Sequence, residues 1–248
     1  MVTQLILTKP KLDLTRFDVR LLRGDEADTA AYRALRDKIR NSEDARNYAD
    51  SYTREDELNE PLWREWCAVK REHCIVGTFD RKKGNKLVSI MMITAQGPVD
   101  SLVAEWEATW VEPDYRGSGV ARRAYDKVER QTREYGYQHA VVYIRDDNHH
   151  SRAIREGQGF TYLATHDVEW ADGTTAPSDL FIRDLYPSDP AEENPHQHTI
   201  TRLEATLESM KGEVPFIEVA IQNRIAALRQ ERVEALRPGY RLVRGHPA

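Results

Sequence analysis

Val111-Glu-Pro-Asp-Tyr-Arg-Gly-Ser-Gly-Val-Ala121 is the stretch that decides the fold, because it joins the end of a predicted strand to the start of a predicted helix. Gly117 and Gly119 let successive backbone N–H groups converge, since neither residue carries a Cβ atom. The N-terminus of the following helix adds partial positive charge. These features favour a nest for a pyrophosphate. A glycine pair before a helix is also typical of a tight turn that binds nothing, so the loop alone leaves both interpretations open.

The elements around this loop predict an α/β fold with a mainly antiparallel sheet. Apolar and alternating runs predict strands at 17–22, 73–80, 86–94, 102–111, 140–144, 161–165 and 176–183. Helical spacing predicts helices from Asp25 or Asp28 to about 41, and at 62–72, 120–135 and 148–158. In the second helix, the residues expected to point inward are Leu62, Trp66, Cys67 and Val69. The order of elements indicates a meander with one β-α-β crossover.

Three further features agree in register with this loop, and together they resemble the GNAT superfamily of N-acyltransferases. Arg116-x-x-Gly119-x-Ala121 matches that family's Arg/Gln-x-x-Gly-x-Gly/Ala acyl-CoA signature. The strand that ends at Val111 is similar to the family's fourth strand. Asn148 lies eleven residues before Gly159-Phe160, as in the family's Asn-x10-Gly-Phe helix. The resemblance covers about residues 17–185 and implies a GNAT-type sheet with flanking helices.

The resemblance also implies where acetyl-CoA, the acyl donor, would bind. In this fold the fourth and fifth strands splay apart after a bulge, and the peptide-like pantetheine arm adds to the open edge like an extra strand. The arm would run along Thr109, Trp110 and Val111. Asn148 would hydrogen-bond it, cap its own helix, or do both. The pyrophosphate would lie over Arg116, Gly117, Ser118, Gly119, Val120, Ala121 and Arg122, although Arg122 equally fits an ordinary solvated arginine.

The chemistry requires a base that takes a proton from the ammonium and a group that stabilises or protonates the leaving thiolate. Glu105 and Glu107 are the candidate bases, and they share a strand face unless the bulge turns one away. Paired carboxylates would hold a cationic amine and raise one pKa; either side chain could instead face solvent. The family often has a tyrosine seven residues after the asparagine, where this chain has Arg155. Arg155 cannot usefully donate a proton at neutral pH but would stabilise a thiolate, with Ser151 and Tyr143 as weaker substitutes.

Composition and charge argue against several other classes. The 248 residues are 40% hydrophobic and 31% charged, which excludes a fully disordered chain. The longest nearly apolar run, 87–95, is too short to cross a bilayer, and the N-terminus lacks a signal-peptide pattern, so a cytoplasmic protein is expected. A net charge of −5 argues against bulk nucleic-acid binding through charge alone. No metal is expected, because His149 and His150 would point about 100° apart on a helix.

The chain divides into an N-terminal arm at 1–16, an acyltransferase domain at 17–186, an acidic proline-rich linker at 187–198 and a helical C-terminal extension at 199–248. Apolar spacing interrupted by Gly212 and Pro215 is typical of two helices in a hairpin. The extension would pack on its own domain, form a homodimer, or offer its basic end to an acidic partner such as RNA. That end, 223–248, carries six arginines against two glutamates.

The sequence therefore predicts an N-acetyltransferase that moves an acetyl group from acetyl-CoA to a primary amine by direct transfer in a ternary complex. The acceptor would be a small molecule or a protein. The acidic stretch 43–60 favours a cationic acceptor or is a solvated loop. The alternative is a non-catalytic acyl-CoA-binding module whose helical tail engages a partner. A toxin that acylates charged tRNA is a weaker interpretation, motivated only by the basic tail.

Overall fold

The computed structural model describes residues 13–48, 60–187 and 195–235. Most of the predicted N-terminal arm and linker, much of the acidic stretch, and the last three arginines of the basic end lie outside these residues. The statements below concern the described residues.

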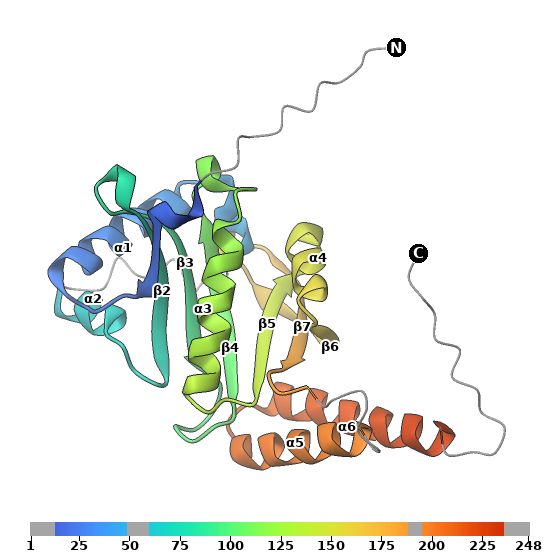
Figure 1. Cartoon of the computed structure of the whole chain (residues 1–248). Helices are drawn as coiled ribbons and strands as arrows, with labels where there is room; N and C mark the ends of the chain where they lie inside the picture. Colours follow the sequence, from blue (N-terminus) through green and yellow to red (C-terminus); the bar gives the residue numbers. More distant parts are fainter. Residues whose placement is uncertain (1–12, 49–59, 188–194, 236–248) are drawn as a thin grey trace.

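A seven-stranded mixed sheet forms the centre of the molecule (Figure 1). The strands are β1 (Phe17–Leu21), β2 (His73–Asp80), β3 (Lys86–Ala95), β4 (Val103–Val111), β5 (His139–Arg145), β6 (Thr161–Glu169) and β7 (Thr175–Asp184). They lie in the order β1-β2-β3-β4-β5-β7-β6, and every neighbouring pair is antiparallel except β4 with β5. The predicted mixed, mainly antiparallel sheet is confirmed. β6 runs four residues beyond its predicted end, because 166–169 continue the ladder with β7.

Six α-helices flank the sheet: α1 (Glu26–Arg40), α2 (Glu60–Cys67), α3 (Val120–Glu134), α4 (His149–Gly157), α5 (Pro195–Met210) and α6 (Pro215–Ala235). α3 packs on one face, where Val128 joins a core that contains Met91 and Trp106. α1 and α2 pack on the other face, where Tyr32 and Ile39 meet the alternate β3 residues. Successive strand residues point to opposite faces, so the two helix layers enclose the sheet.

The second helix differs from its prediction. α2 ends at Cys67 rather than near 72, and it buries Trp63 and Cys67. Trp63 packs edge-on against Tyr32, with ring centroids 5.9 Å apart. The inward placement predicted for Leu62, Trp66 and Val69 is wrong, since these side chains are 42%, 37% and 44% exposed. Packing against α1 decides which face of this two-turn helix is buried. Val69 lies beyond the end of the helix, so the helical spacing used to predict its inward placement does not apply to it.

β4 and β5 stay together for only a short distance. Their parallel pairing joins 103–105 to 139–141 and then stops. Two residues farther along β4 the register against β3 shifts, and Ala108 there has a positive φ of 49°. This is a β-bulge, which bends the strand and disrupts the ladder locally. The far half of β4 therefore has an edge that β5 does not pair with, and the candidate site lies beside it.

The C-terminal extension forms a helical hairpin that packs on its own domain (Figure 1). α5 and α6 cover the β5-β7-β6 part of the sheet on the face opposite α3. Ile200, Leu203, Ile217 and Ile221 are buried there with Leu180 of β7. Of the interpretations of the extension, packing on its own domain is the one that the described residues show; homodimerisation stays a prediction.

This packing makes a stability prediction. Ile221 is fully buried on α6, whereas Val219, also β-branched and on the same helix, is 54% exposed. Ile221→Ala should lower the free energy of unfolding by about 2–5 kcal/mol. Val219→Ala should change it by less than about 0.5 kcal/mol. Urea unfolding measures both, and equal effects would show that α6 does not pack as described.

Candidate active site

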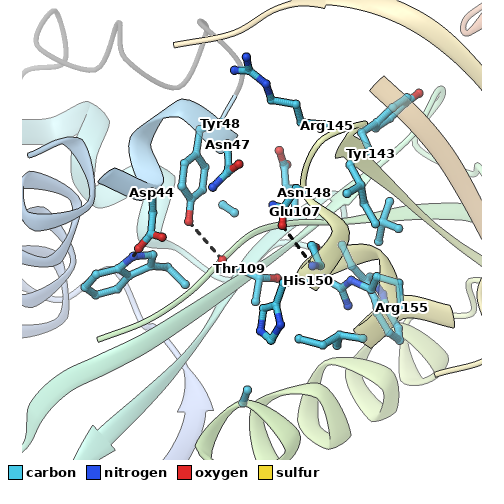
Figure 2. A pocket seen from close by; sticks show the side chains of 18 of the residues that line it. Asp44, Asn47, Tyr48, Glu107, Thr109, Tyr143, Arg145, Asn148, His150 and Arg155 are labelled. Carbon is cyan, nitrogen blue, oxygen red and sulfur yellow. Dashed lines mark hydrogen bonds between the residues drawn. The ribbon is translucent and has the colours of Figure 1, made fainter. Parts of the chain in front are cut away.

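A cavity of about 760 Å³ lies where β4 and β5 diverge (Figure 2). Its walls come from the far half of β4, the loop before α3, α4, the segment 43–47, and the facing residues of β5, β6 and β7. Of the predicted site residues, those that line it are Glu105, Glu107, Thr109, Trp110, Val111, Arg116, Gly117, Gly119, Ala121, Asn148 and Arg155.

Three predicted residues do not line the cavity with their side chains. The Ser118 hydroxyl donates to the carbonyl of Tyr115. Val120 is buried in a small core with Phe17. Arg122 is exposed and does not line the cavity, which agrees with the solvated alternative. The Val120 side chain is buried, so this residue would offer a ligand its backbone alone.

The loop before α3 has the geometry of an anion nest. Gly117 and Gly119 have φ angles of 74° and 90°, in the left-handed region that favours glycine. Gly119 is the N-cap of α3 and no side chain caps the helix, so its first N–H groups have no partner within it. Tyr115 anchors the loop, since its hydroxyl donates to Asp80 Oδ2 at 2.9 Å. A pyrophosphate fits such a helix N-terminus.

A short 3-10 helix, η2 (Glu43–Asn47), lines the cavity through Asp44 and Asn47. Asp44 accepts a hydrogen bond of 2.8 Å from Trp110 Nε1 and forms an ion pair with Arg116. The next residue after the helix, Tyr48, donates to the Thr109 carbonyl at 3.1 Å, as Figure 2 shows. On the other side, Arg145 donates to the carbonyl of residue 46 at 2.9 Å. Residues 44–48, called the strap below, thus connect β4 to β5.

The two candidate bases lie together in the cavity wall. Glu105 and Glu107 share one face of β4, because the bulge follows them and does not separate them. Gln96 Nε2 donates to Glu105 Oε2 at 2.8 Å, and the Thr94 hydroxyl donates to Glu107. Burial and then the neighbouring Glu107 raise the pKa of Glu105 well above its ordinary value. Burial also raises the pKa of Glu107, but the hydrogen bond from Thr94 opposes that rise.

Arg155 reaches the same strand from α4. Its guanidinium is buried and donates to Thr109 Oγ1 at 3.1 Å and to Gln158 Oε1 at 3.2 Å. It lies 4.5 Å from the centre of the Tyr125 ring. Asn148 caps α4 by accepting a hydrogen bond of 3.1 Å from the Ser151 N–H, and its side chain lines the cavity. The cap is therefore present, and the predicted contact with pantetheine stays a prediction.

Sequence reasoning missed several cavity residues. Asp44, Arg145 and Trp170 carry no local motif, and Asp44 meets Trp110 across 66 positions of the chain. Tyr143, named only as a weaker substitute, lines the cavity from β5. Burial, followed by Glu105, raises its pKa above the ordinary value of 10, so its hydroxyl stays protonated.

The residues present fit acetyl-CoA. The nest offers backbone N–H groups to phosphate, and the unpaired edge of β4 offers backbone groups to an amide-bearing arm. The carboxylates stand at the inner end of that edge. In the described part of the chain no group of three or more His, Cys, Asp or Glu side chains could hold a metal ion. No described helix is long and apolar enough to cross a membrane.

Comparisons with known proteins agree with the fold described above. Residues 37–160, half of the chain, match the model of the Acetyltransferase (GNAT) family. A putative acetyltransferase from Salmonella typhimurium, solved with its cofactor acetyl-CoA, is similar with a TM-score of 0.55 at 16% identity, over 72% of this chain and 99% of that chain. A GCN5-related N-acetyltransferase from Kribbella flavida gives 0.54 at 16% identity, over 69% and 99%. At these identities the likeness shows the fold. No protein of curated function matches the chain.

The buried carboxylates make a prediction about stability. The pKa of Glu105 is raised above its ordinary value of 4.5, so above about pH 4.5 the folded chain holds a proton that the unfolded chain releases. Its carboxyl therefore costs stability increasingly as the pH rises. Glu105→Gln should raise the free energy of unfolding at pH 7, by about 1.4 kcal/mol for each unit by which the pKa is raised. Below pH 4 the gain should vanish; urea unfolding at both pH values measures it, and a gain independent of pH would contradict the assignment.

Proposed function

The chain belongs to the Acetyltransferase (GNAT) family, and from this premise we propose that it transfers the acetyl group of acetyl-CoA to a primary amine, directly and in a ternary complex. One observation carries the proposal: two half-buried carboxylates share a face of β4 at the inner end of a strand edge that β5 does not pair with, and this edge leads to an anion nest. A cationic amine and an acyl donor would meet there.

The donor would be held mainly by backbone groups. Gly117, Gly119 and the first turn of α3 would bind the pyrophosphate through N–H groups. The edge of β4 at Thr109 to Val111, which has no strand partner, would pair with the amides of pantetheine, in part in place of the side chains of Tyr48 and Arg116 that bond its carbonyls. When bound, acetyl-CoA supplies a thioester carbonyl as the electrophile. The chain contributes position, because holding both substrates in line supplies much of the acceleration.

The two carboxylates would have different roles. Burial raises the pKa of Glu107, but the Thr94 hydroxyl and the charge of Arg36 oppose that rise, so Glu107 would ionise before Glu105. Its negative charge would hold the ammonium of the acceptor and keeps the pKa of Glu105 high. A base is most effective when its pKa lies near the working pH. Glu105 therefore fits the base that takes the proton of the ammonium, and Glu107 fits the residue that positions the amine.

A screen of amines tests this function. Purified protein, acetyl-CoA and a panel of primary amines, including polyamines, amino sugars and lysine peptides, are mixed and free thiol is measured. Glu105→Gln should lower amine-dependent thiol release by about 10²–10⁴-fold, because the base is lost. Glu134→Gln, an exposed carboxylate on α3, is the matched control and should retain activity. Binding of acetyl-CoA without turnover of any amine would contradict the proposal and favour the non-catalytic binding module.

The pH profile tests the division of roles. Removing the charge of residue 107 should lower the pKa of Glu105, because two like charges no longer face each other. In Glu107→Gln the acid limb of kcat/KM should therefore move to lower pH, while KM for the amine rises. An acid limb that stays in place would show that Glu107 does not set the pKa of the base.

A further inference from the structure

Arg155 is a buried cation without a counter-charge. Only 4% of its surface is exposed, and no carboxylate of the described residues forms an ion pair with it. Arg152, one turn earlier on α4, shows the contrast, because it pairs with Asp179. Both hydrogen-bond acceptors of Arg155, on Thr109 and Gln158, are neutral oxygens.

Its other neighbours are aromatic. The guanidinium lies 4.5 Å from the ring centre of Tyr125 and 5.6 Å from that of Phe160. Such ring faces attract a cation, but they do not neutralise it. An unpaired buried charge is costly, so a cation kept in a cavity wall indicates an anion supplied by a ligand.

The place of Arg155 identifies the part of the ligand that carries this anion. It donates to Thr109, the second residue after Glu107 on the unpaired edge of β4 (Figure 2). The anion nest begins seven residues beyond Thr109, at Arg116. Because the amine must be deprotonated beside Glu105 and Glu107, the thioester end of the donor belongs near Thr109 and the pyrophosphate belongs at the nest. The charge that develops near Arg155 is thus that of the departing sulfur.

We propose that Arg155 is a catalytic residue that stabilises the thiolate of CoA as the leaving group, so that the sulfur leaves without receiving a proton in the site. The inference rests on the acetyl transfer proposed above. The amine nitrogen forms a bond with the acyl carbon, and the carbon–sulfur bond breaks with its electron pair on sulfur. The ammonium loses two protons in all, one before the nitrogen attacks and one as the amide forms, and both pass through the carboxylate base to water. The products are the amide and the CoA thiolate, whose charge Arg155 balances.

The phenol of Tyr143 is not needed as the acid. Tyr143 lines the cavity, but burial makes its hydroxyl a weaker proton donor than an exposed tyrosine. A fixed guanidinium provides the stabilisation without a proton transfer, since it is always charged. Electrostatic groups aimed at developing charge are among the largest contributions to catalysis.

The test reads the thiol itself. Thiolate absorbance of CoA bound to the protein is followed against pH, which requires no turnover. The pKa of the bound thiol should be lower than that of free CoA by about 1 to 3 units. Arg155→Met should abolish this difference, Arg155→Lys should keep part of it, and the matched control Arg152→Met should keep all of it. A thiol pKa in the wild type equal to that of free CoA would overturn the inference.

Desulfo-CoA separates the thiolate from the phosphates. At pH 8, Arg155→Met should weaken binding of CoA about tenfold and leave binding of desulfo-CoA unchanged. Equal weakening of both ligands would place Arg155 at another part of CoA and overturn the proposal. In turnover, Arg155→Met should lower kcat by about 10²–10³-fold, with KM for acetyl-CoA little changed. A lowered thiol pKa in a wild type that acetylates no amine would contradict the proposed function and leave the contact with the thiolate standing.

Discussion

The rest of the structure depends on the parallel pairing of β4 with β5, which ends after three residue pairs. Backbone N–H and C=O groups that lose a partner inside a sheet must find another one. Here the bulge at Ala108 turns β4 away, and the strap supplies one replacement, because the Tyr48 hydroxyl donates to the backbone carbonyl of Thr109. Arg155 of α4 donates to the side-chain hydroxyl of the same residue. The cavity, the loop before α3 and the carboxylates are all arranged around this one interruption of the sheet.

Side chains of opposite charge lie before and after the bulge of β4. Glu105 and Glu107 precede the bulge, and Arg155 approaches just after it. Each is unfavourable to bury on its own, because a low dielectric penalises an uncompensated charge. Together they would suit the proposed acyl transfer to an amine, in which the acceptor would enter as a cation and the donor would leave as an anion. In that reaction the arrangement would complement the charges of the reacting groups, as electrostatic catalysis requires.

The sequence predicted best what depends on neighbours along the chain. The loop at 116–121 and the asparagine at the start of α4 could be predicted from residues a few positions apart. Most strands and helices could be predicted in the same way. The cavity walls formed by Asp44, Tyr48 and Arg145 were not predictable, because their contacts span 61 to 99 positions. The face of α2 was predicted wrongly for a related reason: in two turns of helix, Tyr32 of another element decides what is buried. The spacing of apolar residues at the C-terminal end indicated two helices. It did not indicate that these helices cover the face of the sheet that contains Leu180.

The missing strand partner of β4 and the missing counter-charge of Arg155 have a consequence for the lifetime of the protein. A ligand that binds the folded chain and not the unfolded chain stabilises it by mass action, by about 2.7 kcal/mol at a hundred times its dissociation constant. Acetyl-CoA or CoA would provide both the missing strand partner along β4 and the counter-charge for Arg155. Degradation by proteases that attack the unfolded chain would then slow whenever the donor is plentiful and quicken when it is scarce. The divergence of β4 and β5, which forms the cavity, would thereby link the amount of this protein to the supply of its acyl donor.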